Sequence, residues 1–300
     1  MKSIIEQINE LRKEKNAVIL AHNYQRGEVQ DIADFAGDSL GLSQQAASTD
    51  ADVIVFCGVH FMAETAKILS PKKTVLLPDP NAGCPMANML AKKELIQFKS
   101  EHLGALSVAY VNCSAEIKAE VDVCCTSANA VRVVESLPAD KEILFVPDQS
   151  LGDYVRRKTG RNIVLWPGYC PTHHRFLERD VEEARAAHPD APVCIHPEAT
   201  HEVLEQADFI GSTSQILEFC KESDKQEFVI GTEIGILHTL KKQNPGKEFY
   251  PLSLLGDCPN MKLTTLEKIL WSLQDMEFEI KLDEEVRKRA EASVQKMVTL

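Results

Sequence analysis

Short, almost continuous apolar runs alternate along the chain with longer stretches whose apolar residues recur every three or four positions. Runs such as AVILAH (17–22), DVIVFC (52–57) and TVLL (74–77) have the length and β-branched content of strands. Strands without polar alternation belong to parallel sheets that helices cover on both faces. The opening segment has apolar residues at Ile4, Ile5, Ile8 and Leu11, which is helical spacing. This pattern predicts an α/β fold.

The strand–helix pattern repeats three times. ADFAGDS (33–39), VDVCCTS (121–127) and ADFIGST (207–213) align without gaps, and their shared aspartates are 88 and 86 residues apart. Each copy contains four strands, with helical segments between them. We therefore predict three αβα sandwich units, each with a small parallel sheet, at residues 1–84, 85–170 and 171–258. The C-terminal helical segment 259–300 is expected to join the first unit.

Local signals predict several helix ends. Thr264 and Glu267 have the spacing of a capping box for a helix that starts after residue 264. A last helix is expected over 283–297, with Val286, Ala290 and Val294 facing inward. The three hydroxyl residues that end the repeated segment are predicted helix N-caps: Ser39, Ser127 and Thr213.

Charge and composition exclude several classes of protein. The 300 residues carry a formal net charge of −12, which argues against a broad nucleic-acid or anionic-membrane surface. No apolar run reaches the ~18 residues that a membrane span needs. The N-terminal segment lacks the apolar core of a signal peptide, so we expect a cytoplasmic protein with no nucleic-acid or membrane partner. In a reducing compartment the nine cysteines are not expected to form a disulfide framework.

Three cysteines differ from the others because each precedes a proline in a loop. Cys84, Cys170 and Cys258 are 86 and 88 residues apart, so each repeat delivers one thiol. They could be structural thiols whose prolines merely end strands. They could also form a zinc site with His173 or His174, although structural zinc sites draw on closely spaced ligands. Ligands this far apart favour a metal cluster where the units meet. An iron–sulfur cluster held by three thiolates leaves one iron open as a Lewis acid.

Polar residues cluster where the predicted strands end. Parallel strands place their carboxyl ends at one edge of the sheet, where ligands bind in α/β folds. His196 and Glu198 are two residues apart and are predicted to share one face of an extended segment. That arrangement suits proton transfer by Glu198, with His196 polarising a substrate oxygen. The other residues at such positions are His22, Asn23, Tyr24, Ser39, Tyr110, Asn112, Ser127 and Thr213.

Eight motifs, in order along the whole chain, together resemble the quinolinate synthase family. They are AHNYQ, GDSL, FMAETAKIL, CPMANML, YVNCSAE, TSANA, HPE and GTEIG. The resemblance implies three αβα domains with pseudo-threefold symmetry around a [4Fe-4S] cluster. It also implies condensation of iminoaspartate with dihydroxyacetone phosphate to quinolinate in de novo NAD biosynthesis, with loss of phosphate and two waters. Functional coupling to an L-aspartate oxidase or dehydrogenase, which would supply iminoaspartate, follows from the same resemblance.

The family motifs also imply roles for single residues. Cys84, Cys170 and Cys258 would ligate the cluster. Glu198 would be the main acid/base group, and His196, Tyr24 and Tyr110 would be catalytic with it. The residues that would hold the substrates are His22, Ser39, Tyr110, Val111, Asn112, Ser127, His196, Pro197, Glu198 and Thr213.

One segment departs from the family, and two other functions stay open. Some members have a CxxC pair at the last ligand, whereas this chain has Cys258-Pro259-Asn260-Met261, which removes that redox switch. A cluster-dependent hydro-lyase acting on another small dicarboxylate is one alternative. A non-enzymatic iron–sulfur sensor or electron carrier is the other, and it does not require polar groups at so many strand ends.

Overall fold

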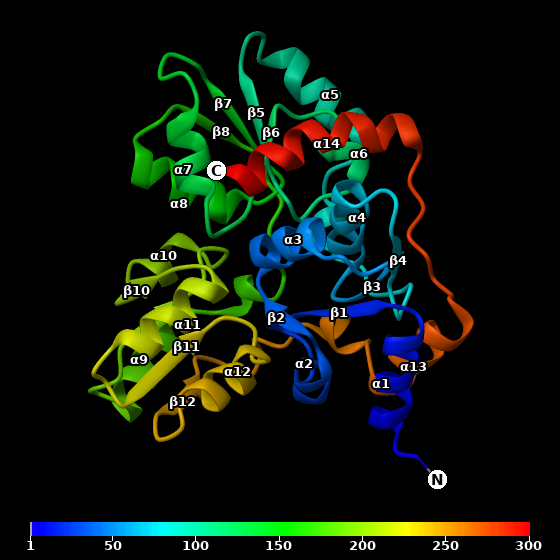
Figure 1. Ribbon diagram of the computed structural model, residues 1–300. Helices are drawn as coiled ribbons and strands as arrows, with labels where there is room; N and C mark the ends of the chain where they lie inside the picture. Colours follow the sequence, from blue (N-terminus) through cyan, green and yellow to red (C-terminus); the bar gives the residue numbers. More distant parts are fainter. Residues whose placement is uncertain (1) are drawn as a thin grey trace.

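The computed structural model describes residues 2–300 and contains three four-stranded parallel sheets (Figure 1). Each sheet belongs to one stretch of the chain, and the order of elements within each stretch is the same. This confirms the predicted α/β class with three αβα units. The unit boundaries themselves stay a prediction.

The first sheet has the strand order β2-β1-β3-β4, and the other two repeat it as β6-β5-β7-β8 and β10-β9-β11-β12. The first stretch comprises α1 (Ile4–Glu14), β1 (Ala17–His22), α2 (Gly27–Ile32), β2 (Phe35–Gly37), α3 (Ser39–Ser48), β3 (Val53–Cys57), α4 (His60–Leu69) and β4 (Thr74–Leu76). The second comprises α5 (Lys92–Glu101), β5 (Leu106–Tyr110), α6 (Ala115–Lys118), β6 (Val123–Cys125), α7 (Ala130–Ser136), β7 (Ile143–Val146), α8 (Gln149–Thr159) and β8 (Ile163–Leu165). The third comprises α9 (Glu178–Ala187), β9 (Val193–Ile195), α10 (His201–Leu204), β10 (Phe209–Ile210), α11 (Thr213–Glu222), β11 (Glu227–Gly231), α12 (Ile236–Gln243) and β12 (Glu248–Pro251).

A short 3₁₀ helix lies beside the Cys-Pro pair that follows the last strand of each sheet. These helices are η1 (Met86–Asn88), η2 (His173–Arg175) and η3 (Pro259–Lys262). The chain then ends with α13 (Leu266–Asp275) and α14 (Glu284–Thr299). The central strands β1, β3, β5 and β7 are buried almost throughout, which explains their unbroken apolar sequence.

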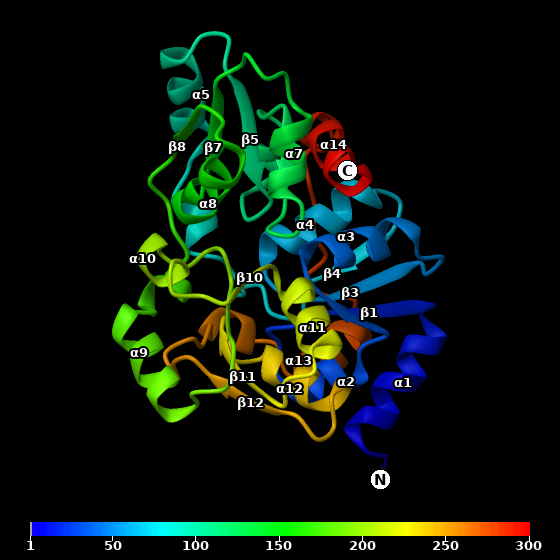
Figure 2. The ribbon, with the colours of Figure 1, turned by 90° about the vertical axis from the view of Figure 1, so that its left-hand side faces the viewer.

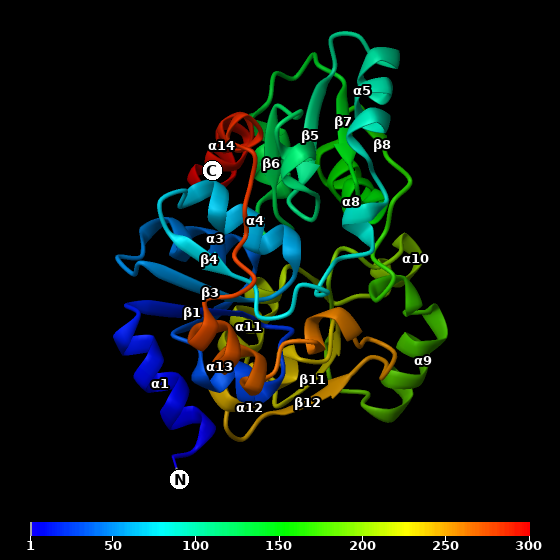
Figure 3. The same cartoon turned by 90° about the vertical axis from the view of Figure 1, so that its right-hand side faces the viewer.

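Helices α13 and α14 pack against the first and second stretches of the chain. α13 packs against α1, and the backbone of Phe278 and Ile280 pairs with β4 of the first sheet. α14 lies against α4 of the first stretch and against α6 and β6 of the second (Figures 2 and 3). Ala290 and Val294 are fully buried there, as expected, whereas Val286 is only half-buried. No helix among residues 2–300 is long and apolar enough to cross a membrane.

Each helix cap is a different residue from the one predicted. The cap of α13 is Thr265, whose hydroxyl accepts from the Lys268 N–H, so the Thr264–Glu267 capping box is wrong. Asp38 caps α3 and Ser212 caps α11. Ser39 and Thr213 are instead the first helical residues, and Ser127 lies in the turn before α7. A helix N-terminus accepts hydroxyl residues both at the cap and just inside it, so composition alone did not choose between adjacent positions.

One glycine is required by close packing beside a Cys-Pro loop. A Cβ on Gly168 would lie 2.3 Å from the carbonyl oxygen of Pro147, which is backbone and has little freedom to move. We expect Gly168→Ala to destabilise the protein by about 1–3 kcal/mol and to displace the loop that carries Cys170. Thermal unfolding measures this effect. Gly83→Ala, beside Cys84, is the control, because its Cβ would have no neighbour closer than 3.9 Å. Equal stability of the two variants would contradict the prediction.

Candidate active site

The carboxyl ends of the strands surround one cavity of about 240 Å³. All three stretches of the chain contribute to its wall, as expected if their functional edges face a common centre. Its polar lining includes the predicted residues His22, Tyr24, Ser39, Tyr110, Asn112, Ser127, His196, Glu198 and Thr213, together with Cys84, Cys170 and Cys258. The cavity is therefore the candidate active site.

The three Cys-Pro thiols reach this cavity in the same way. In each loop, backbone N–H groups of the adjacent 3₁₀ turn lower the pKa of the thiol, because they stabilise its thiolate form. The donors are Met86 and Ala87 for Cys84, His173 for Cys170, and Asn260 and Met261 for Cys258. Amide donors of this kind are a feature of cluster-binding thiolates. The repeated Cys-Pro turn thus builds the same sulfur environment three times.

The surroundings of these three cysteines favour the neutral thiol over the thiolate. Burial raises the pKa of Cys84 to about 12, despite the nearby backbone N–H groups. Burial and the charge of Glu198 raise the pKa of Cys170 well above its usual value, and burial also raises the pKa of Cys258. Three thiols that share one cavity become thiolates when a cationic group replaces their protons. The donor set is soft sulfur, which suits an iron–sulfur cluster.

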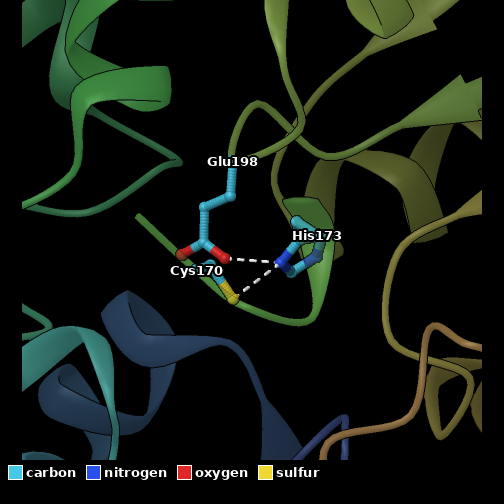
Figure 4. Close-up of side chains that lie close together, drawn as sticks. All are labelled: Cys170, His173 and Glu198. Carbon is cyan, nitrogen blue, oxygen red and sulfur yellow. Dashed lines mark hydrogen bonds and ion pairs between the residues drawn. The ribbon is translucent and has the colours of Figure 1, made fainter. Parts of the chain in front are cut away.

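Glu198 is the centre of a buried hydrogen-bond network. Its Oε1 accepts from the Tyr110 hydroxyl at 2.6 Å and from the Asn112 amide at 3.3 Å. Its Oε2 lies 2.7 Å from Nδ1 of His173 (Figure 4). Burial alone would raise the pKa of Glu198. The charge and hydrogen bond of His173, with His196 and Tyr110, outweigh it and hold that pKa well below the usual range. Glu198 is therefore a carboxylate at neutral pH.

His173 also contacts the thiol of Cys170, and these two residues with Glu198 could hold a metal ion. Their ligand atoms all lie within 4.8 Å of one another (Figure 4). A thiolate, an imidazole and a carboxylate are ligands that zinc accepts. His174 does not line the cavity, because its Nε2 is bonded to Ser150 and its ring stacks on Tyr169. Of the two histidines, His173 is thus the one that faces the site.

The chain is similar to known proteins over nearly its whole length. Residues 6–299 match the family model described as "Quinolinate synthetase A protein". The chain is 53% identical over 295 residues to a quinolinate synthase of Dehalococcoides mccartyi strain CBDB1, covering 98% of this chain and 97% of the relative. A quinolinate synthase of Thermodesulfovibrio yellowstonii is 52% identical over 297 residues, with 99% and 98% covered. One of Synechocystis sp. is 50% identical over 304 residues, with 100% and 96% covered.

The chain belongs to the quinolinate synthase family. The resemblance seen in its motifs is confirmed over nearly the whole length.

Two histidines occupy equivalent places in the family fold and have the same tautomer. Nδ1 of His22 accepts from the Tyr24 N–H at 3.2 Å, and Nδ1 of His196 accepts from the Glu198 N–H at 3.3 Å. Burial lowers the pKa of His22 to about 4 and that of His196 to about 3, so both rings are neutral at pH 7. Each then carries its proton on Nε2, which can donate to a substrate oxygen. In His196 this atom lies 3.1 Å from the hydroxyl of Ser127.

The segment that carries His196 and Glu198 is a turn, so the expectation of an extended segment is wrong. The Ala199 N–H closes the turn on the His196 carbonyl at 3.1 Å. Pro197 lies two residues after the end of β9, within that turn. The two side chains still approach each other, with 3.8 Å between His196 Nδ1 and Glu198 Oε2.

Two predicted substrate residues are not brought into the cavity lining. Val111 packs its side chain in the hydrophobic core and donates its N–H to Cys125. Pro197 is buried within the turn and is also absent from the cavity wall. Asn112, another predicted substrate residue, does line the cavity. Its amide oxygen is buried and has no protein partner. That oxygen is free to accept from a ligand.

Sequence reasoning missed the end of the third strand in the third sheet. Thr232 and Glu233 follow β11 directly, and both are buried. Glu233 accepts from the Cys258 N–H at 3.1 Å and from the Lys262 ammonium at 2.8 Å, so it anchors the third Cys-Pro loop. Both residues belong to the GTEIG motif, which is the sequence feature that could have identified them. The polar positions predicted from the sequence lie only at the ends of the first and second strands of each unit.

Proposed function

We propose that this protein is a quinolinate synthase of NAD biosynthesis, a transferase that condenses iminoaspartate with dihydroxyacetone phosphate. The observation that carries the proposal is the single cavity on which three equivalent Cys-Pro loops and the Glu198 network converge. The names of relatives at 50–54% identity support the same activity.

The cavity suits small anionic substrates. Arg175 is the only residue with a permanent positive charge among the described residues that line it. The first residues of α3 and α11, Ser39 and Thr213, also face the cavity, and helix N-termini favour carboxylate and phosphate groups. His22 and His196 add Nε2–H donors. These groups would hold a dicarboxylate and a phosphate-bearing partner.

The proposed cofactor is a [4Fe-4S] cluster held by Cys84, Cys170 and Cys258. When bound, it would supply an iron with an open coordination position, which is a Lewis acid for the loss of water. In each Cys-Pro loop, backbone N–H groups lower the pKa of the thiol, and this repeated arrangement supports the three sulfurs as ligands. The Cys170–His173–Glu198 group supports a second candidate, a single divalent cation.

The chain's own residues would move the protons that condensation and ring closure require. Glu198, ionised at neutral pH, would accept a proton from a substrate carbon or nitrogen and later return it. His196 would polarise a substrate oxygen through Nε2–H. Tyr24 and Tyr110 lie on the cavity wall and would exchange hydrogen bonds with the substrates.

An anaerobic assay with iminoaspartate and dihydroxyacetone phosphate tests the activity. We expect formation of quinolinate, identified by mass, with release of one phosphate for each quinolinate. An iron–sulfur sensor would show a reversible redox couple and no product. A hydro-lyase would dehydrate a single dicarboxylate without consuming dihydroxyacetone phosphate. Absence of quinolinate from protein with intact metal content would overturn the proposal.

A further inference from the structure

Lys262 ends the 3₁₀ helix beside the third Cys-Pro pair and bonds to two other segments of the chain. Its ammonium lies 2.8 Å from Oε1 of Glu233 and donates to the backbone carbonyl of Tyr24. Its own carbonyl accepts from Nε of Arg26 at 2.8 Å. Lys262 does not line the cavity, and only 17% of its side chain is exposed. It therefore joins the third loop to the turn after β1 from outside the cavity.

Glu233 extends this link to the third proposed sulfur ligand. The oxygen that faces Lys262 also accepts from the Cys258 N–H at 3.1 Å. The other oxygen accepts from the Gly235 N–H at 2.7 Å. Glu233 is fully buried, so the ammonium of Lys262 is the cation that balances its carboxylate. One buried ion pair thus connects the backbone of a ligand cysteine with the backbone of Tyr24.

The segments approach one another so closely that glycine is required at position 235. A Cβ on Gly235 would lie 2.7 Å from Nζ of Lys262 and 2.8 Å from Oε2 of Glu233. It would also lie 2.8 Å from the carbonyl carbon of Tyr24. The ion pair therefore sits where the end of β11, the third loop and the turn after β1 meet.

We propose that Lys262 is a positioning residue that couples the third Cys-Pro loop to the turn carrying Tyr24. A metal group held by Cys258 would fix this loop and, through Glu233 and Lys262, the turn as well. The turn would in return help to retain the metal, because partners behind a ligand hold it in place. The inference rests on the proposed function, since it takes Cys258 as a ligand and Tyr24 as a catalytic group.

Lys262→Met keeps the length of the side chain and removes its charge and its donors. We expect a ferrous-iron chelator to remove iron from this variant about 10- to 100-fold faster than from the wild type. Hydrogen exchange should show weaker protection of the amides of residues 22–26, at the level that the wild type reaches after its metal is removed. Wild-type iron release and protection in Lys262→Met would overturn the inference.

Lys67→Met is the matched control. Lys67 is as deeply buried as Lys262, with 15% of its side chain exposed, and it also pairs with a carboxylate and a backbone carbonyl. These partners belong to Glu279 and Lys73, which do not line the cavity. Lys67→Met should release iron at the wild-type rate and keep residues 22–26 protected. Faster iron release in this control, equal to that of Lys262→Met, would show general loosening of the fold and overturn the inference.

A double variant separates the coupling from the cost of an unpaired buried charge. Adding Glu233→Gln to Lys262→Met removes both charges, so thermal stability should return toward that of the wild type. Iron release should stay fast and residues 22–26 weakly protected, because the bond to the Tyr24 carbonyl is still missing. Recovery of both properties together with stability would assign the effect to the unpaired charge and overturn the coupling.

Iron release and hydrogen exchange are measured without substrates, so they test the coupling separately from the activity. A wild type that holds iron but forms no quinolinate would overturn the proposed function and leave these measurements to decide the coupling. A wild type whose protection at residues 22–26 does not change on removal of the metal would overturn the coupling alone.

Discussion

Cys84→Ser, Cys170→Ser and Cys258→Ser should each abolish quinolinate formation and leave the anaerobically purified protein without its cluster. The wild type should contain about four irons and four sulfides per chain. Serine replaces a soft thiolate ligand with a hard alcohol of similar size. Cluster binding should therefore fail, while the Cys-Pro loop keeps its conformation. Each sulfur has the same kind of turn, and loss of any one removes a third of the protein ligands.

Iron and sulfide analysis, with the absorption spectrum, measures this result. Cys220→Ala is the control, because Cys220 is buried in the core of the third unit and does not line the cavity. It should keep full iron. Full iron in any of the three loop variants would contradict the cluster assignment. If only Cys170→Ser lost metal, the Cys170–His173–Glu198 group would be the metal site, and it would hold a single cation.

The repeat made the fold and the thiols predictable from the sequence. Each unit has the same order of strands, so an apolar run in one copy could be checked against two others. Cys84, Cys170 and Cys258 follow the last strand in every copy, and convergence of those strand ends brings their thiols to one cavity. Short-range sequence patterns were enough to predict the Cys-Pro loops, because each loop is a local feature and occurs three times.

Contacts between units could not be predicted in this way. The choice between His173 and His174 depends on which side of η2 faces the cavity, and that is decided by packing against Phe176 and Thr232. The Thr232 hydroxyl lies 2.6 Å from the hydroxyl of Tyr24, although 208 residues separate the two in the chain. A local sequence pattern does not indicate a contact between residues so far apart in the chain. The sequence placed Glu198 in the site, but its low pKa depends on His173, His196 and Tyr110, and two of these lie far from it in the chain.

Glu198→Gln should keep the cluster and lower kcat about 10²- to 10⁴-fold, which is the usual contribution of a positioned acid or base. The substitution is nearly isosteric, and a glutamine oxygen can still accept from Tyr110. Its amide cannot take a proton from substrate at neutral pH. It also turns a donor toward His173, where the carboxylate accepted at 2.7 Å. Both changes act on turnover and leave the three sulfur ligands in place.

Steady-state kinetics, with iron analysis on the same samples, checks this prediction. The control is Glu202→Gln, four residues further on and exposed to solvent, which should retain wild-type kcat. Because the pKa of Glu198 lies well below the usual range, the residue stays ionised from mildly acidic to neutral pH. Glu198 should accordingly contribute no acidic limb to the wild-type pH profile near the ordinary glutamate pKa of about 4.3. An acidic limb near pH 4 is instead expected from His22, whose pKa is about 4 and whose ring must be neutral. Wild-type turnover in Glu198→Gln would remove Glu198 from proton transfer, and Tyr24 and His196 would then be the remaining acid/base groups.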